Sequence, residues 1–156
     1  IRATAANETL IIRNSLATRP WQHVLEPLSG YLWLGSLMLQ GEDKYSSSWN
    51  FGPNDSDILS VEEILNIALR CWNKTTYKLD DKANPHEAQS LKLDISKAKA
   101  ELKWQPVYNV NTAVEKTMEW YKNYYENKSI SIKDFTIDQI RDYVNDAKIK
   151  NIVWGD

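Results

Sequence analysis

The sequence predicts a mixed α/β protein that resembles the smaller lobe of a larger fold more than a complete nucleotide-binding domain. Segments with helical spacing alternate with short β-rich runs. These runs are too short and too scattered for a full doubly wound parallel sheet. The five glycines cannot be combined into a dinucleotide-binding fingerprint or a phosphate loop. The chain therefore carries mixed secondary structure without the usual nucleotide-binding signature.

The composition limits the classes of function and the kinds of site that the chain can have. The 156 residues suffice for one domain with a hydrophobic core. The net charge of −2 gives no general affinity for nucleic acid, so a bound anion needs a local cationic group. The single Cys71 excludes an internal disulfide, and two histidines leave little for a metal site. Without a signal-peptide pattern or an apolar run near the roughly 20 residues of a membrane span, a cytoplasmic protein without membrane contact is expected.

The first half of the chain is expected to lead from a strand through a corner into a helix. Residues 1–6 predict the end of a helix, and the β-rich run 9–13 predicts a strand. A helix over 27–40 follows, because Pro27 suits a first helical turn and apolar spacing continues to its end. Residues 49–53 predict a short buried strand.

The middle of the chain repeats this alternation. Ser60 and Glu63 form a capping box that opens a helix. The run 75–79 predicts a strand, and the alternation of Leu91 and Leu93 predicts another.

Helices dominate the C-terminal third. A short helix before Trp104 places Ala98 and Leu102 inward, and Asn111 is expected to cap a longer helix. Thr136 and Gln139 predict a capping box for a last helix that ends near Asp146. The expected organisation is a lobe over 1–146 and a C-terminal tail over 147–156.

The corner over 19–27 concentrates functional groups between a strand and a helix, where α/β proteins present residues to a ligand crevice. Its polar and aromatic side chains are Arg19, Trp21, Gln22, His23 and Glu26. The Arg19 guanidinium offers a fixed fork of donors that suits a pyrophosphate. The alternative is a structural turn with one surface arginine.

Two weaker signals lie elsewhere. His86 and Glu87 occupy a polar loop before an expected strand, and the alternatives are a loop that closes over a ligand or a surface turn. Tyr124 and Lys128 have the spacing of a catalytic tyrosine and its lysine, but they fall where a helix ends. We assign no catalytic residue to this chain.

Several motifs at matching spacing identify a resemblance that covers about residues 1–145. They are IIRN at 11–14, RPWQHVLEPLSGYL at 19–32, WNFGP at 49–53, PHEA at 85–88, LKLD at 91–94, SKA at 96–98, LKWQP at 102–106 and TMEWY at 117–121. The chain resembles the C-terminal part of the CDP-glucose 4,6-dehydratases, which are extended short-chain dehydrogenases/reductases.

This resemblance implies an α/β fold that is the smaller C-terminal substrate-binding lobe, with short strands, several helices and the Rossmann half absent. It implies that Arg19 contacts the pyrophosphate of CDP-glucose. Many relatives have a second phosphate-binding arginine where this chain has His86 and Glu87, so His86 is expected near the nucleotide. Trp21 and His23 either shape the site beside Arg19 or only pack the corner.

The resemblance also implies the chemistry of the intact enzyme. A bound NAD takes a hydride from C4 of the glucose, water leaves across C5 and C6, and the hydride returns to C6. The product, CDP-4-keto-6-deoxyglucose, leads to dideoxyhexoses of lipopolysaccharide O-antigens. The missing N-terminal Rossmann half would bind NAD and supply the catalytic tyrosine and lysine, so this chain alone is expected to be inactive. The intact enzyme is expected to be a homo-oligomer.

Two alternatives remain open. One is a lobe of another sugar-nucleotide epimerase or dehydratase of the same family. The other is a stand-alone, non-catalytic binding module.

Overall fold

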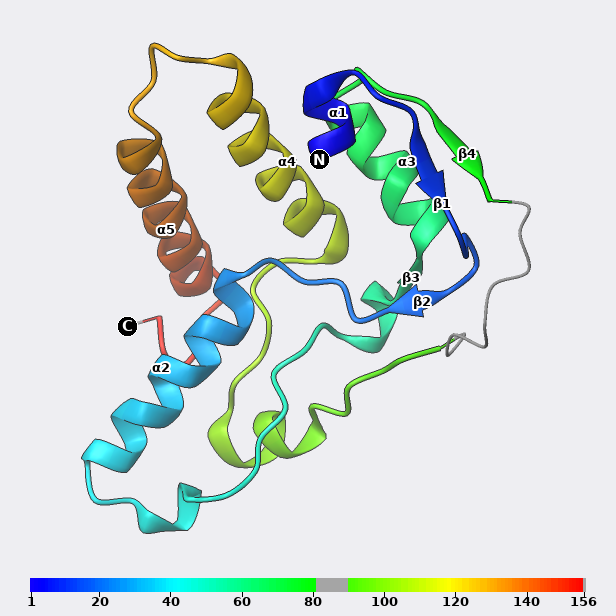
Figure 1. Ribbon diagram of the computed structural model, residues 1–156. Coiled ribbons are helices and arrows are strands. Elements are labelled where there is room, and N and C mark those ends of the chain that lie inside the picture. The colour runs from blue at the N-terminus through cyan, green and yellow to red at the C-terminus, as the bar shows by residue number, and fades with distance from the viewer. Residues whose placement is uncertain (81–89, 156) are drawn as a thin grey trace.

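The computed structural model describes residues 1–80 and 90–155, and it has the mixed α/β architecture expected from the sequence (Figure 1). The α-helices are α1 (Arg2–Ala6), α2 (Leu25–Leu39), α3 (Val61–Cys71), α4 (Val110–Glu126) and α5 (Ile132–Ile149). The strands are β1 (Leu10–Ile12), β2 (Thr18–Arg19), β3 (Leu59–Ser60) and β4 (Tyr77–Leu79). Shorter helical turns are η1 (Asp43–Tyr45), η2 (Asp55–Asp57) and the π-helical turn η3 (Ala98–Leu102).

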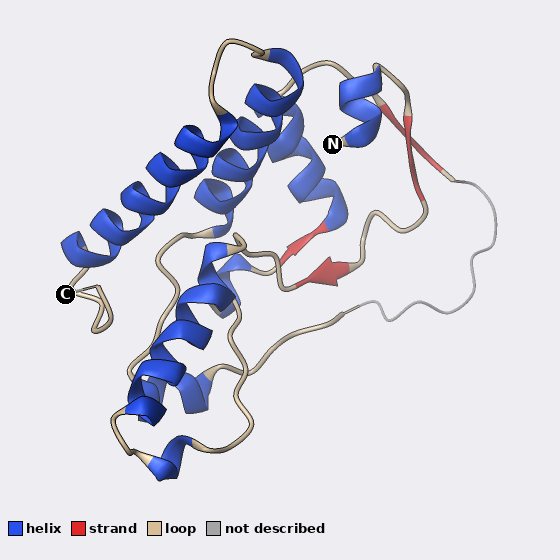
Figure 2. Ribbon diagram, turned by 60° about the vertical axis from the view of Figure 1, so that its left-hand side comes forward, coloured by secondary structure: helices blue, strands red, loops and turns tan. Residues whose placement is uncertain are grey.

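The strands form two small sheets and leave most of the packing to helices (Figure 2). β1 runs parallel to β4, with Leu10 opposite Tyr77, and β2 runs antiparallel to β3, with Arg19 opposite Leu59. α3 packs against α4, and α4 packs against α5. This small-lobe α/β architecture confirms the predicted fold class.

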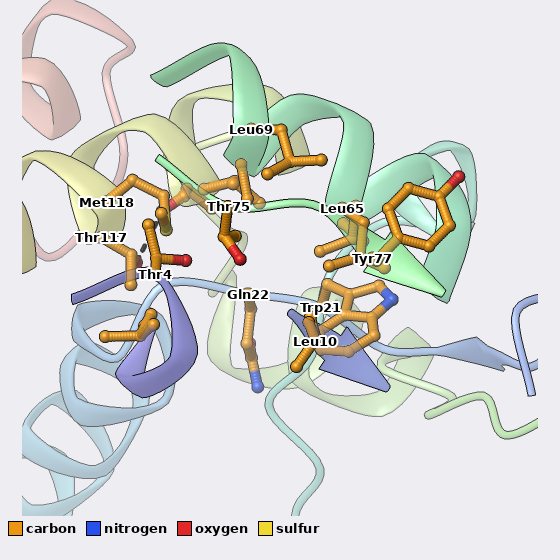
Figure 3. Close-up of a pocket in the computed structure, with 15 residues that line it drawn as sticks. Thr4, Leu10, Trp21, Gln22, Leu65, Leu69, Thr75, Tyr77, Thr117 and Met118 are labelled. Atoms are coloured by element: carbon orange, nitrogen blue, oxygen red, sulfur yellow. Dashed lines mark hydrogen bonds between the residues drawn. The ribbon is translucent and has the colours of Figure 1, made fainter. Parts of the chain in front are cut away.

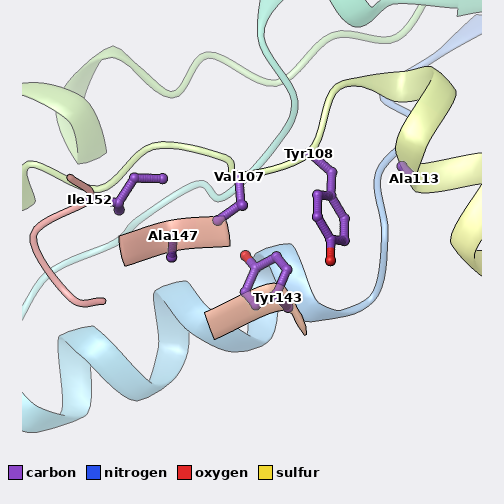
Figure 4. Packing of buried hydrophobic residues seen from close by; sticks show 6 residues of the cluster. All are labelled: Val107, Tyr108, Ala113, Tyr143, Ala147 and Ile152. Carbon is purple, nitrogen blue, oxygen red and sulfur yellow. The ribbon is translucent and has the colours of Figure 1, made fainter. Parts of the chain in front are cut away.

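The core consists of two hydrophobic clusters. The first lies where the segment before α4 meets α5, and its buried side chains converge in Figure 4; they are Val107, Tyr108, Ala113, Tyr143, Ala147 and Ile152. The second lies beside α2 and η3 and consists of Phe51, Ile95, Ala98, Leu102 and Trp104. Trp154 packs against both clusters, so the end of the chain contributes to the core.

Close approach of Phe51 to α2 requires a glycine. A Cβ atom at Gly30 would lie 2.3 Å from Phe51 Cδ1. The Phe51 ring contacts Trp104 edge to face, with ring centroids 5.0 Å apart. The absence of a side chain at Gly30 therefore lets the second cluster form against the helix.

The strands predicted at 49–53 and 91–93 are wrong for the part of the chain that the structure describes. Residues 51–53 are buried, but they pack through side chains and form no ladder. A Cβ atom at Gly52 would lie 3.0 Å from Leu93 Cβ, so the two segments are neighbours. The Leu91 N–H donates to the Thr18 carbonyl oxygen at 3.3 Å, which leaves one isolated bridge. Phe51 is buried against α2, whereas Leu91 is 51% exposed, so neither apolar pattern reflects a strand ladder.

The capping box of α3 is confirmed. The Glu63 N–H donates to Ser60 Oγ at 3.3 Å, and the Ser60 N–H donates to Glu63 Oε2 at 2.8 Å.

The starts predicted for α4 and α5 are wrong. Asn109, rather than Asn111, caps α4 by accepting the Thr112 N–H at 2.9 Å. Ser131 caps α5 by accepting the Asp134 N–H at 3.3 Å.

Thr136 serves a different purpose from the predicted cap. Its hydroxyl donates to the Ile132 carbonyl oxygen at 2.7 Å and accepts the Trp120 indole N–H at 2.8 Å, which ties α5 to α4. α5 ends at Ile149 rather than near Asp146. Among the described helices, none combines the length and the apolar character needed to cross a bilayer.

Candidate functional site

The candidate site is the corner between β2 and α2, here called the Arg19 corner and defined as residues 19–26. Arg19 lies at its start and is half-buried. Its backbone pairs with Leu59 of β3, and its guanidinium donates to the Thr18 carbonyl oxygen at 2.8 Å. Strand pairing therefore fixes the backbone that carries this cation.

Trp21 turns into the lobe. Its indole N–H donates to the Leu59 carbonyl oxygen at 2.9 Å, and its backbone N–H donates to the Arg19 carbonyl oxygen at 2.9 Å. The ring borders an apolar cavity of about 240 Å³ (Figure 3). Across this cavity lie Leu65 and Leu69 of α3. The contacts of Trp21 thus anchor the corner to β3.

Gln22 anchors the next position. Its side-chain amide donates to the Phe51 carbonyl oxygen at 3.1 Å. Its Oε1 is buried and has no hydrogen-bond partner among the described residues. The side chain borders the cavity of Figure 3 on one side and a second cleft, between α2, α4 and α5, on the other.

His23 is buried, with 6% of its surface exposed. Its Nδ1 accepts the Leu25 N–H at 3.3 Å, and its ring contacts the Tyr108 ring edge to face at 5.8 Å between centroids. Burial and, to a smaller extent, the positive charge of Lys116 lower the pKa of His23. A neutral imidazole that accepts a backbone N–H is the form that this geometry favours.

Glu26 carries the carboxylate of the corner, and this group accepts three hydrogen bonds. Only 1% of the residue is exposed. The backbone N–H groups of Val107 and Tyr108 donate to Oε2 at 2.9 Å and to Oε1 at 2.8 Å. The Tyr143 hydroxyl donates to Oε2 at 2.8 Å. One carboxylate therefore joins α2 to the segment before α4 and to α5.

The electrostatics of this carboxylate combine opposing effects. Burial raises the pKa of Glu26, while the hydrogen bonds from Tyr108, Val107 and Tyr143 and the positive charge of Lys150 act to lower it. The Lys150 ammonium donates to the Val107 carbonyl oxygen. Burial, and next the charge of Glu26, raise the pKa of Tyr143, so its hydroxyl stays a donor.

The sequence-predicted site residues fall into two groups. The structure brings Arg19, Trp21 and His23 together in one corner, with the contacts of Trp21 and His23 directed into the lobe. His86 and Glu87 lie outside the described residues.

In the sequence, Glu26 stands out only as one of the polar side chains of the corner. No local sequence pattern predicts the hydrogen-bond partners of Glu26, which lie 81, 82 and 117 positions away along the chain. In the described part, no group of three or more histidine, cysteine, aspartate or glutamate side chains could hold a metal ion.

Comparison with known proteins gives a relative in sequence. The chain is 38% identical over 133 residues to a CDP-glucose 4,6-dehydratase of Salmonella typhimurium, and the match covers 85% of this chain. It spans only 37% of that enzyme's length. No protein-family model matches the chain.

Two solved structures are similar in fold. A UDP-N-acetylglucosamine 4-epimerase from Bacillus cereus aligns with a TM-score of 0.56 and 26% identity over 76% of this chain and 39% of the epimerase. A UDP-glucose 4-epimerase from Thermotoga maritima aligns with a TM-score of 0.59 and 17% identity over 80% of this chain and 38% of the epimerase. The chain is therefore similar in sequence to the C-terminal part of a CDP-glucose 4,6-dehydratase and shares its fold with part of the extended short-chain dehydrogenases/reductases, which confirms the resemblance inferred from its motifs.

Proposed function

We propose that this chain is the substrate-binding portion of an NAD-dependent CDP-glucose 4,6-dehydratase, in which Arg19 binds the pyrophosphate of CDP-glucose. The observation that carries the proposal is the Arg19 corner, because it presents a guanidinium on a strand-fixed backbone within a chain similar to such a dehydratase. A guanidinium donates parallel hydrogen bonds to phosphate oxygens without losing its charge. The chain's net charge of −2 makes such a local cation necessary for binding an anion.

The described residues do not fit a site for NAD. Their strands form only two-stranded sheets, and the chain's five glycines make no dinucleotide fingerprint. NAD and the hydride chemistry would therefore belong to the part of the dehydratase that this chain does not match. The isolated chain is accordingly expected to be inactive.

The test is a titration of the complete gene product with CDP-glucose. We expect Arg19→Ala to raise the KM for CDP-glucose about tenfold or more, because a charge-assisted hydrogen bond to the pyrophosphate is worth roughly 1.5–3 kcal/mol. Arg70→Ala is the matched control, since Arg70 is an exposed arginine at the end of α3. An Arg19→Ala variant with an unchanged KM would show that Arg19 does not bind the pyrophosphate.

A second candidate is a related enzyme for another sugar nucleotide. The two solved structures favour it, because both are described as epimerases of UDP-linked sugars. Comparing CDP, UDP, GDP and dTDP as inhibitors of the complete gene product separates the two candidates. Strongest inhibition by CDP supports the dehydratase, whereas strongest inhibition by UDP supports the epimerase.

A further inference from the structure

The carboxylate of Glu26 is placed to set geometry as well as to fill space. Both of its oxygens accept hydrogen bonds, and the donors include two successive backbone N–H groups. Two N–H donors side by side need two acceptor atoms. An ionised glutamate supplies two acceptor oxygens, whereas a glutamine would place its own NH₂ donor against one of the two N–H groups. The pairing fixes the position of α2 along the segment 107–108.

Simple packing does not require a charge at this place. Glu26 has no direct ion pair among the described residues, and burying a carboxylate is costly unless hydrogen bonds compensate. An apolar residue would fill the volume but would deprive the Val107 and Tyr108 N–H groups and the Tyr143 hydroxyl of this acceptor. What the carboxylate adds is a fixed orientation of the first turn of α2 relative to two distant segments.

That orientation reaches the rest of the Arg19 corner. The Tyr108 N–H binds Glu26, and the Tyr108 ring packs edge-on against His23. His23 in turn accepts the Leu25 N–H at the start of α2. The corner is therefore held at one end by the strand pairing of Arg19 and at the other by the hydrogen bonds of Glu26.

We propose that Glu26 is a positioning residue for sugar-nucleotide binding, which acts by holding the downstream end of the Arg19 corner; the inference rests on the function proposed above. Glu26 itself would touch no substrate. Loss of its hydrogen bonds frees the α2 end of the corner from the segment 107–108 and from α5, so the corner keeps only the anchors of Arg19, Trp21 and Gln22 and holds a bound pyrophosphate in a less fixed geometry.

The experiment uses Glu26→Gln and Arg19→Ala in the complete gene product. We expect Glu26→Gln to raise the KM for CDP-glucose by roughly tenfold while kcat changes by less than about twofold, because the lost interaction is one of substrate placement. Ser131→Ala is the control for stability alone, because it removes the cap of α5 far from the corner. Its KM should equal that of the wild type.

A measurement that is independent of activity accompanies the kinetics. Amide hydrogen exchange is measured in peptides that cover residues 19–26, with each variant held the same number of degrees below its own melting temperature. Exchange should be at least about tenfold faster in Glu26→Gln than in Ser131→Ala. If Glu26→Gln does not fold, Tyr143→Phe removes one of the three hydrogen bonds and should give the same changes at about a third of the size on a logarithmic scale.

The outcomes separate the two proposals. If Arg19→Ala raises KM and Glu26→Gln behaves like Ser131→Ala in both KM and exchange, the positioning role is wrong while the pyrophosphate role stands. If Arg19→Ala leaves KM unchanged, the proposed function of the corner is wrong. Faster exchange over 19–26 would then assign Glu26 a purely structural role and overturn the inference as well.

Discussion

Individual side chains of the Arg19 corner are fixed by contacts with residues far away in the sequence. Trp21, Gln22 and Glu26 donate to or accept from backbone groups of three different segments. A residue of this kind contributes to stability and to the shape of the corner at the same time. The protonation state of Glu26 is therefore measurable through folding.

Glu26 gives a pH-dependent prediction of defined sign. Burial raises its folded-state pKa above the ordinary 4.5, so the folded protein binds this proton more tightly than the unfolded chain. The resulting stabilisation is present below about pH 4.5 and is lost as the pH rises through the folded-state pKa. We expect the difference in unfolding free energy, wild type minus Glu26→Gln, to decrease in urea titrations as the pH rises above about 4.5.

Glu63 is the control with the opposite sign. Its hydrogen bonds with the Ser60 backbone and side chain lower its pKa, so its stabilisation is present above the unfolded-state pKa and is lost as the pH falls. The difference between wild type and Glu63→Gln should therefore increase with pH. A difference for Glu26→Gln that also increases with pH would contradict the raised pKa.

Among the elements, α2 connects the corner to both hydrophobic clusters. Gly30 on this helix leaves room for the Phe51 ring, whereas a Cβ atom at Gly35 would have nothing within 4 Å. We expect Gly30→Ala to lower the unfolding free energy by about 1–3 kcal/mol through overpacking. Gly35→Ala should raise it by up to about 1 kcal/mol through helix propensity. Urea denaturation of both variants measures these changes, and equal effects would contradict the packing of Phe51 on α2.

The capping residue of α5 gives a second prediction for an element. Ser131→Ala removes the hydroxyl that accepts the Asp134 N–H, so it should cost about 1 kcal/mol of stability. Thermal unfolding followed by circular dichroism checks this value. A stability equal to that of the wild type would mean that the helix starts elsewhere.

Local sequence chemistry predicted some elements and missed others for identifiable reasons. The Ser60 and Glu63 box was predictable because both partners lie within one turn. The start of α5 was missed because Thr136 and Gln139 have capping spacing but bind α4 instead. Residues 49–53 read as a strand because burial against α2 produces the same apolar pattern as a sheet.

For the candidate site, the motif at Arg19 was visible in the sequence, and its resemblance to the dehydratases is confirmed. The role of Glu26 was not visible, because its hydrogen-bond partners come from residues 107, 108 and 143. Side-chain identity marked the corner, while tertiary structure decided which members point inward.

In the whole molecule, the C-terminal segment completes the core that supports the corner. Ile152 is 2% exposed within the first cluster, and the Trp154 ring stacks on Tyr143 with centroids 5.4 Å apart. We expect Ile152→Ala to lower the unfolding free energy by about 2–4 kcal/mol. Val153→Ala is the matched control, because Val153 is 43% exposed and should change stability by less than about 0.5 kcal/mol. Chemical denaturation of both variants measures the contrast, and a small loss at Ile152 would contradict docking of the segment.

The hydrogen bond between Glu26 and Tyr143 spans 117 positions and has a consequence for the order of events during synthesis. A ribosome releases the Arg19 corner long before it has made α5. Until then the carboxylate of Glu26 lacks its hydroxyl donor, and the first cluster lacks the side chains of the last helix. The nascent chain therefore gains its finished corner only after residue 143 has been made, so premature termination before that residue would yield a protein that contains Arg19 but lacks the complete support of its corner.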